Sequence, residues 1–146
     1  MNDLSTVLLV EDNEDDAELI AYAFDKAGIE NPLTTVSDGD AAVAYVEGTA
    51  PYADRTAHPT PGLILLDLKL PRRSGFEVLQ AIREHPETRR TPVVVLTSSG
   101  EQGDIDRAYD LGANSYLVKP VNREALLAMV KTLDAYWVRL NKTMAV

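Results

Sequence analysis

The sequence contains no cysteine, and this absence excludes three kinds of chemistry. Without thiols the chain can form no disulfide, no thiolate metal site and no cysteine nucleophile. Histidine is also scarce, with two residues in the chain. His58 falls in a predicted exposed loop and His85 at a predicted helix end before Pro86. We therefore expect neither histidine to carry chemistry.

Basic residues are fewer than acidic residues in this chain. The chain has 14 Lys and Arg against 23 Asp and Glu, which gives a net charge of −9. Nucleic acids and anionic membranes attract clustered Lys and Arg, so we expect neither as a partner. No apolar run approaches the length of a membrane span, and the first six residues lack the basic region of a secretory signal. A reducing cytoplasm is the expected location.

Short apolar runs alternate with amphipathic segments along the whole chain. The 146 residues fit one domain with a full hydrophobic core. Strands are predicted at residues 6–10, 33–36, 63–66, 93–96 and 115–118. Helices are predicted at about 13–27, 40–47, 76–85, 102–111 and 123–140, and the proline-rich residues 48–62 are predicted to form a long exposed loop.

This order repeats a strand and a helix five times. It is typical of a parallel sheet with helices on both faces. Because crossovers between parallel strands are right-handed, the arrangement is expected to be doubly wound. The weak, half-polar second strand suits an edge position. We therefore predict an α/β flavodoxin-like fold with a five-stranded sheet in the order 2-1-3-4-5.

The most informative stretch runs from Leu63 to Pro71. Four consecutive apolar residues lead directly into Asp67, as expected of a strand that is buried on both faces and ends at this acid. Ligands of open α/β sheets bind at the carboxyl ends of the strands. Asp67 is therefore a candidate functional residue, although an aspartate at this position could also simply form a turn.

Two further acids, Glu11 and Asp12, follow the first predicted strand, which neighbours the third in this topology. Two carboxylates about 4 Å apart repel by roughly 4 kcal/mol at an effective dielectric constant near 20. A divalent cation would offset this repulsion, and an all-oxygen ligand set with open positions suits Mg²⁺. The alternative is that Glu11 and Asp12, like the acids at residues 14–16, favour a helix N-terminus.

Thr97 and Lys119 follow the fourth and fifth predicted strands. A carboxylate beside a metal ion, an ammonium group and a hydroxyl can accept a phosphoryl group, with Asp67 as the nucleophile. Taken singly, Thr97 could be a routine strand-end residue and Lys119 a solvated side chain. Their common position at one sheet edge favours the chemical interpretation.

These motifs resemble the receiver domain of two-component response regulators. The resemblance rests on residues 8–12, 65–67, 95–97 and 119–120, together with Pro71 and Gly75, and it covers about residues 6–133. It implies that Asp67 is the phosphoacceptor and that a histidine kinase supplies the phosphoryl group. It also implies that Mg²⁺ or Mn²⁺ is held by Asp67, by Asp12 directly, by Glu11 largely through water and by the backbone carbonyl of Lys69.

The same resemblance assigns the remaining residues of the site. Thr97 would bond the phosphoryl group and Lys119 would pair with it, while Tyr116 fills the family's rotating aromatic position. Ser98 stands where many members have alanine and would leave room near the phosphoryl group. On phosphorylation, Thr97 would move toward the phosphoryl group and Tyr116 would turn inward.

A narrower resemblance concerns the long loop and residues 113–117 and 133–137. These segments look like single-domain regulators paired with phytochrome-type histidine kinases. We expect one receiver domain over residues 1–146 with no output domain. In the last helix, the predicted inward stripe consists of Leu126, Val130, Leu133, Trp137 and Leu140, whereas Leu127, Tyr136 and Val138 fall outside it.

Aromatic residues near the end of the chain suggest an interface. We predict a homodimer through the fourth helix, the fifth strand and the fifth helix. The candidate interface residues are Tyr109, Tyr116, Leu127, Tyr136 and Trp137.

Three other functions remain as alternatives. An aspartyl-phosphate phosphatase needs a second acid two residues after the nucleophile, where this chain has Lys69. A flavin carrier needs a Ser/Thr/Gly-rich loop after the first strand, where this chain has acids. A receiver-like scaffold that never carries phosphate also remains open. We expect a phosphoacceptor rather than an enzyme.

Overall fold

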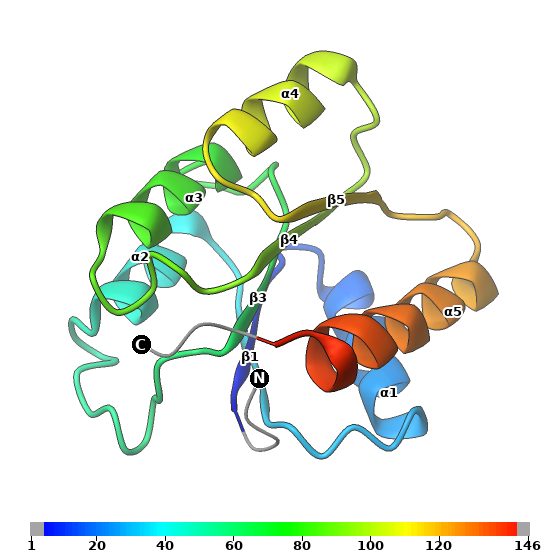
Figure 1. Cartoon of the computed structure of the whole chain (residues 1–146), viewed down its shortest axis with the longest axis horizontal. Coiled ribbons are helices and arrows are strands. Elements are labelled where there is room, and N and C mark those ends of the chain that lie inside the picture. The colour runs from blue at the N-terminus through cyan, green and yellow to red at the C-terminus, as the bar shows by residue number, and fades with distance from the viewer. Residues whose placement is uncertain (1–4, 143–146) are drawn as a thin grey trace.

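The computed structural model describes residues 5–142. Residues 1–4, which hold most of the segment predicted to lack a secretory signal, and residues 143–146 lie outside the described part. The strands are β1 (Val7–Val10), β2 (Leu33–Val36), β3 (Leu63–Leu66), β4 (Val93–Thr97) and β5 (Ser115–Val118). They form one parallel sheet in the order β2-β1-β3-β4-β5 (Figure 1), and the predicted topology is confirmed.

Helices cover both faces of this sheet. They are α1 (Glu14–Lys26), α2 (Gly39–Glu47), α3 (Gly75–Glu84), α4 (Gln102–Asp110) and α5 (Arg123–Leu133), followed by the π-helix η1 (Asp134–Leu140). Side chains alternate along each strand, so Leu8 and Val10 pack toward α2 and α3, whereas Val7 and Leu9 pack toward α1 and α5. Figure 1 shows these two helical layers on opposite sides of the sheet.

Polar side chains fix where most helices begin. Asn13, Asp38, Ser74 and Asn122 each accept a hydrogen bond from a backbone N–H of the first helical turn. Such caps satisfy donors that have no partner within the helix. The caps of α1 and α3 lie in the loops that follow the acidic ends of β1 and β3.

The C-terminal helix differs in kind from the prediction. Residues 123–140 are helical as expected, but the α-helix ends at Leu133 and a π-helix follows. Hydrogen bonds in a π-helix span five residues, as in the bond from the Asn141 N–H to the Tyr136 carbonyl. The inward face shifts accordingly, since Val138, five residues after Leu133, is buried and Trp137 is only half-buried. The prediction that Val138 lies outside the buried stripe was wrong.

The loop of residues 48–62 is also less exposed than predicted. The Arg55 guanidinium donates hydrogen bonds of 2.7 Å to the carbonyls of Tyr45 and Val46 at the end of α2. The buried Tyr45 hydroxyl donates to the Pro59 carbonyl at 2.9 Å. The rings of Tyr52 and His58 are half-buried against Tyr45. The loop is therefore anchored to α2, because its Arg55 binds the helix-end carbonyls and its aromatic rings pack against Tyr45.

Arg83 ties three segments together at the opposite end of the sheet from the acidic residues. Its guanidinium donates to the carbonyls of Gly112 at 2.8 Å and Thr91 at 2.7 Å, and to the side-chain oxygen of Asn114 at 2.9 Å. The same Asn114 oxygen accepts from the Val93 N–H at 2.8 Å. Burial lowers the pKa of Arg83 below its ordinary value. This residue joins the end of α3 to the beginnings of β4 and β5.

We expect Arg83→Ala to lower the free energy of unfolding by about 2 kcal/mol, because each hydrogen bond from a charged group contributes ~1.5–3 kcal/mol and Arg83 is partly solvated. The measurement is chemical denaturation of the variant and the wild type. The control is Arg90→Ala, which removes an exposed arginine from the neighbouring loop. Equal losses in the two variants would contradict the proposed role of Arg83.

Candidate functional site

The acidic residues lie together because of the register between β1 and β3. Val10 is aligned with Leu66, so Glu11 and Asp67 are the next residues along the two strands. The Asp67 N–H bonds the Val10 carbonyl at 3.0 Å, which extends the ladder by one step. One carboxylate oxygen from each of Glu11, Asp12 and Asp67 lies within 4.8 Å of the others. The predicted crowding of these three acids is confirmed.

Lys119 is the cation of this cluster. Its backbone N–H bonds the Thr97 carbonyl at 2.7 Å, which carries the β4–β5 ladder past the end of β5. Its ammonium nitrogen lies 2.7 Å from Glu11 Oε1 and 3.4 Å from Asp67 Oδ2. Burial alone would lower the pKa of Lys119, but the hydrogen bonds to its carboxylate partners raise it above the ordinary value. Lys119 is therefore charged in the folded protein.

Glu11 is the most deeply buried of the acids, with 2% of its surface exposed. Burial raises its pKa from the usual 4.5 to about 7, against the opposing effect of the hydrogen bond from Lys119. The negative charge of Asp67 raises this pKa further. A single ammonium group thus does not neutralise the cluster, which retains a strong attraction for additional positive charge.

A third carboxylate, which sequence reasoning missed, pairs with Lys119. Asp16 Oδ2 lies 2.9 Å from the ammonium nitrogen. From the sequence, Asp16 was one of three acids assigned to the helix dipole of α1, together with Glu14 and Asp15. Only the packing of α1 beside the end of β5 shows that Asp16 differs from the other two.

Thr97 and Ser98 occupy different environments. Thr97 is fully buried, and within residues 5–142 its hydroxyl oxygen has no hydrogen-bond partner. Buried polar atoms almost always have a partner, and an exception indicates a ligand, ion or water that completes the site. Ser98 is exposed, so its side chain leaves the region beside Thr97 open.

Tyr116 is held by the loop that follows β4. Its hydroxyl donates to the Ser99 carbonyl at 2.8 Å, and burial raises its pKa above the ordinary value. The Ser99 hydroxyl in turn donates to Asp104 in α4 at 2.6 Å. A movement of the loop after Thr97 would therefore be transmitted both to Tyr116 and to α4.

The loop after β3 approaches Asp67 closely. A Cβ atom on Gly75 would collide with the backbone of Asp67 and Leu68, so glycine is required there. The Lys69 N–H donates to Asp67 Oδ1 at 3.3 Å, while the Lys69 side chain is exposed. The predicted role of the Lys69 carbonyl as a metal ligand stays a prediction.

The donor set fits a hard divalent cation. All three clustered side chains offer carboxylate oxygens, and Asp12 is exposed to solvent. Mg²⁺ and Mn²⁺ prefer such oxygen ligands and are held by a few carboxylates with water completing the shell.

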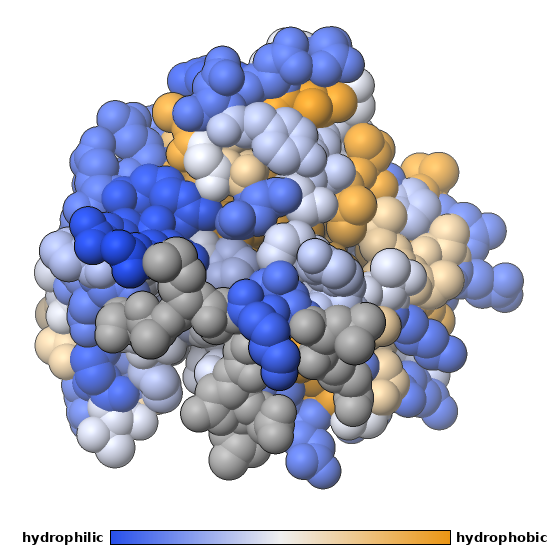
Figure 2. Space-filling model, viewed as in Figure 1, coloured by the Kyte–Doolittle hydropathy of each residue, from blue (hydrophilic) through white to orange (hydrophobic). Residues whose placement is uncertain are grey.

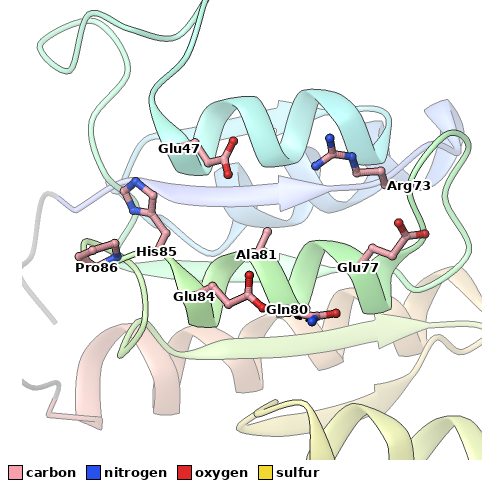
Figure 3. Close-up of a pocket in the computed structure, with 8 residues that line it drawn as sticks. All are labelled: Glu47, Arg73, Glu77, Gln80, Ala81, Glu84, His85 and Pro86. Carbon is pink, nitrogen blue, oxygen red and sulfur yellow. Dashed lines mark hydrogen bonds between the residues drawn. The ribbon is translucent and has the colours of Figure 1, made fainter.

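The surface also has grooves outside this site. A groove of about 480 Å³ between α2 and α3 is lined by charged side chains of both signs, among them Glu47, Arg73, Glu77 and Glu84, which are drawn as sticks in Figure 3. None of the predicted site residues lines it. A second, more apolar groove of about 710 Å³ lies between β5, α5 and η1, with Leu117, Met129, Tyr136 and Trp137 in its wall.

The predicted interface residues do not form one patch. Tyr109 on α4 and Tyr136 on η1 are exposed, whereas Tyr116 and Trp137 are half-buried. Leu127 packs toward the core and lines a separate groove with Tyr22 and Lys26 of α1. Tyr116 thus lies on β5, Tyr136 and Trp137 lie on η1, Tyr109 lies on α4, and Leu127 lies on the α1 side of α5. Within residues 5–142, no helix combines the length and apolar character needed to cross a bilayer.

Carboxylates from two neighbouring strands, a buried lysine and an unpartnered threonine meet at the carboxyl edge of a doubly wound sheet. Fold and site together define a signalling domain that handles phosphoryl groups. The family model of the response regulator receiver domain matches residues 7–131, and the chain belongs to this family.

Known relatives include regulators associated with phytochromes. The chain is 38% identical to the response regulator Rcp1 of Synechocystis sp. over 136 residues, which cover 93% of this chain and 90% of that protein. It matches the phosphorylated cyanobacterial phytochrome response regulator RcpA with a TM-score of 0.90 and 38% identity, over 97% of this chain and 99% of the other. The Mn²⁺-bound form of Rcp1 matches with a TM-score of 0.88 and 37% identity over the same shares. The narrower resemblance seen in the sequence is thereby confirmed.

In the metal-free protein, the free energy of unfolding should fall by about 2 kcal/mol more in the wild type than in Glu11→Gln as the pH rises from about 5 to 8. Folded Glu11 keeps its proton up to about pH 7, whereas the unfolded chain releases it near 4.5, so the folded state binds more protons in this window. Stability from this group is present at low pH and is lost as the pH rises. Denaturation curves in a chelator at several pH values measure the difference, and parallel pH profiles would contradict it.

Proposed function

We propose that Asp67 accepts a phosphoryl group from a histidine kinase in a reaction that depends on Mg²⁺ or Mn²⁺. The observation that carries this proposal is the convergence on one sheet edge of the buried Asp67 carboxylate, the Lys119 ammonium at 3.4 Å and the unpartnered hydroxyl of Thr97. Membership of the receiver family supports it, because receiver domains are in general phosphoacceptors.

In the proposed reaction, a carboxylate oxygen of Asp67 forms a bond to phosphorus while the bond between phosphorus and the histidine nitrogen of the kinase breaks. The electron pair of the broken bond stays on that nitrogen, and the product is an aspartyl phosphate. Lys119 pairs with the negative charge on the phosphoryl oxygens, and the Thr97 hydroxyl donates a hydrogen bond to one of these oxygens. Glu11, Asp12, Asp67 and the Lys69 carbonyl would hold the cation, which supplies further positive charge to the phosphoryl group.

The same contacts provide a switch. Among residues 5–142, the Thr97 hydroxyl has no hydrogen-bond partner, and the Tyr116 hydroxyl donates to the Ser99 carbonyl. A phosphoryl group on Asp67 would give Thr97 a partner and draw the loop after β4 toward the site. Because Ser99 joins this loop to both Tyr116 and Asp104, the movement would change the surface of α4 and β5. The exposed Ser98 would leave room for it.

Lys69 weighs against the phosphatase alternative, since its side chain is exposed and offers no acid two residues after Asp67. The alternative of a scaffold that never carries phosphate does not account for the buried Thr97 hydroxyl or for the surplus negative charge of the cluster. We infer a phosphoacceptor without a separate catalytic activity. The description of RcpA as a phytochrome response regulator favours a kinase of the phytochrome type as the partner. The single-domain organisation and the cytoplasmic location stay predictions.

Asp67→Asn should abolish incorporation of phosphate from a small-molecule phosphodonor, because an amide oxygen is too weak a nucleophile to replace the carboxylate. Labelling of the intact protein, measured by mass, with and without Mg²⁺, tests this. The matched control is Asp110→Asn, an exposed aspartate on α4, which should label like the wild type. A stable label on Asp67→Asn would show that the acceptor is another residue.

We also propose that the protein forms a homodimer through β5, α4 and the C-terminal helices. β5 is an edge strand, and an exposed edge with apolar side chains invites pairing. Tyr109, Val118 and Tyr136 are each more than 40% exposed around this edge. Figure 2 shows hydrophobic surface over β5 and between α4 and α5. The apolar groove beside η1 could receive a side chain from the second copy.

Tyr136→Ser should weaken this dimer by about tenfold, the effect of losing an aromatic anchor from an interface. Sedimentation equilibrium at tens of micromolar measures the association. Tyr22→Ser is the matched control, since Tyr22 is similarly exposed but lies on α1. A wild type that remains monomeric at this concentration would overturn the dimer without touching the phosphoacceptor proposal.

A further inference from the structure

Asp16 is the one partner of Lys119 that lies outside the metal cluster. The ammonium nitrogen is 2.9 Å from Asp16 and 3.4 Å from Asp67, so it sits closer to the helix acid than to the phosphoacceptor. The Asp16 N–H is bonded to the Asn13 side chain at 3.0 Å, which fixes the start of α1 and thereby the position of this carboxylate. Asp16 therefore draws Lys119 away from Asp67.

The partners of Lys119 differ in their contact with water. The side chain of Asp16 is 34% exposed, whereas those of Glu11 and Asp67 are 1% and 7% exposed. A buried carboxylate that loses its cation is left without compensation, while a half-exposed one is solvated by water instead. Asp16 is thus the partner that Lys119 can leave most easily when a stronger anion arrives.

We infer that Asp16 competes with the phosphoryl group for Lys119 and so sets how readily the site accepts and keeps that group. It acts as a positioning residue through Lys119. In the unphosphorylated protein it supplies the third anion around the ammonium group, and on phosphorylation Lys119 exchanges Asp16 for a phosphoryl oxygen. This inference rests on the proposed phosphoacceptor function of Asp67.

The test uses beryllofluoride, which on a carboxylate stands in for an aspartyl phosphate, and the full chain with saturating Mg²⁺. Asp16→Asn should bind beryllofluoride about threefold to tenfold more tightly than the wild type, the range expected when one partly solvated ion pair no longer competes. Asp15→Asn is the matched control, because it removes the same charge from the same helical turn. Asp15 is exposed and makes no ion pair among residues 5–142. The affinity of Asp15→Asn for beryllofluoride should therefore stay within about twofold of the wild-type affinity.

Two further readouts separate competition from a merely structural role. Asp16→Glu keeps the negative charge and should restore an affinity close to that of the wild type. Without Mg²⁺ or beryllofluoride, Asp16→Asn should also shift the ¹⁵N signal of the Lys119 ammonium group and speed its proton exchange, whereas Asp15→Asn should leave both unchanged.

An unchanged or weaker affinity in Asp16→Asn, or an equal gain in Asp15→Asn, would overturn the inference while leaving Asp67 as the acceptor. An unshifted Lys119 signal would show that the ion pair is absent in solution and would overturn it as well. A wild type that binds no beryllofluoride would instead overturn the proposed function together with this inference.

Discussion

The hydrogen-bonded register between β1 and β3 is the constraint on which the site depends. It aligns Val10 with Leu66, and the next residue on each strand is an acid. Parallel strands end at the same edge, so these carboxylates cannot avoid each other once the sheet forms. A shift of one residue would turn every side chain of a strand to the opposite face, and the apolar packing against α1, α2, α3 and α5 forbids it. The energy of the core thus holds together a group of like charges that would otherwise separate.

Electrostatics then determines what this edge can bind. One ammonium group serves three carboxylates, and burial, together with the charge of Asp67, raises the pKa of Glu11. A cation is attracted by the surplus charge, and a phosphoryl group is attracted by the cation and by Lys119. The buried Thr97 hydroxyl adds a donor that has no other use among the described residues. A change of charge at Asp67 therefore changes the electrostatic environment of both Lys119 and Thr97.

The route from this edge to the surface passes through short contacts. Thr97 precedes the loop whose Ser99 binds both Tyr116 and Asp104. At the other end of the sheet, Arg83 fixes the beginnings of β4 and β5. The two strands are thus anchored where they begin, and the switch that we propose lies at their other end, next to α4. The apolar groove next to η1 lies beside the same edge strand.

Sequence alone determined the parallel α/β fold, the strand order and the cluster of Glu11, Asp12 and Asp67, because continuous apolar runs, a helical period of about four residues and the polar residues at strand ends are local signals. Tertiary structure decided features that depend on distant contacts. Asp16 meets Lys119 across 103 residues of sequence, and the charged residues at the start of α1 look alike until α1 is packed. Val138 is buried because a π-helix changes the residue spacing after Leu133. The long loop is anchored because Arg55 donates hydrogen bonds to carbonyls at the end of α2. The orphaned hydroxyl of Thr97 likewise became visible only once its surroundings were in place, since burial and hydrogen-bond partners are properties of the packed chain.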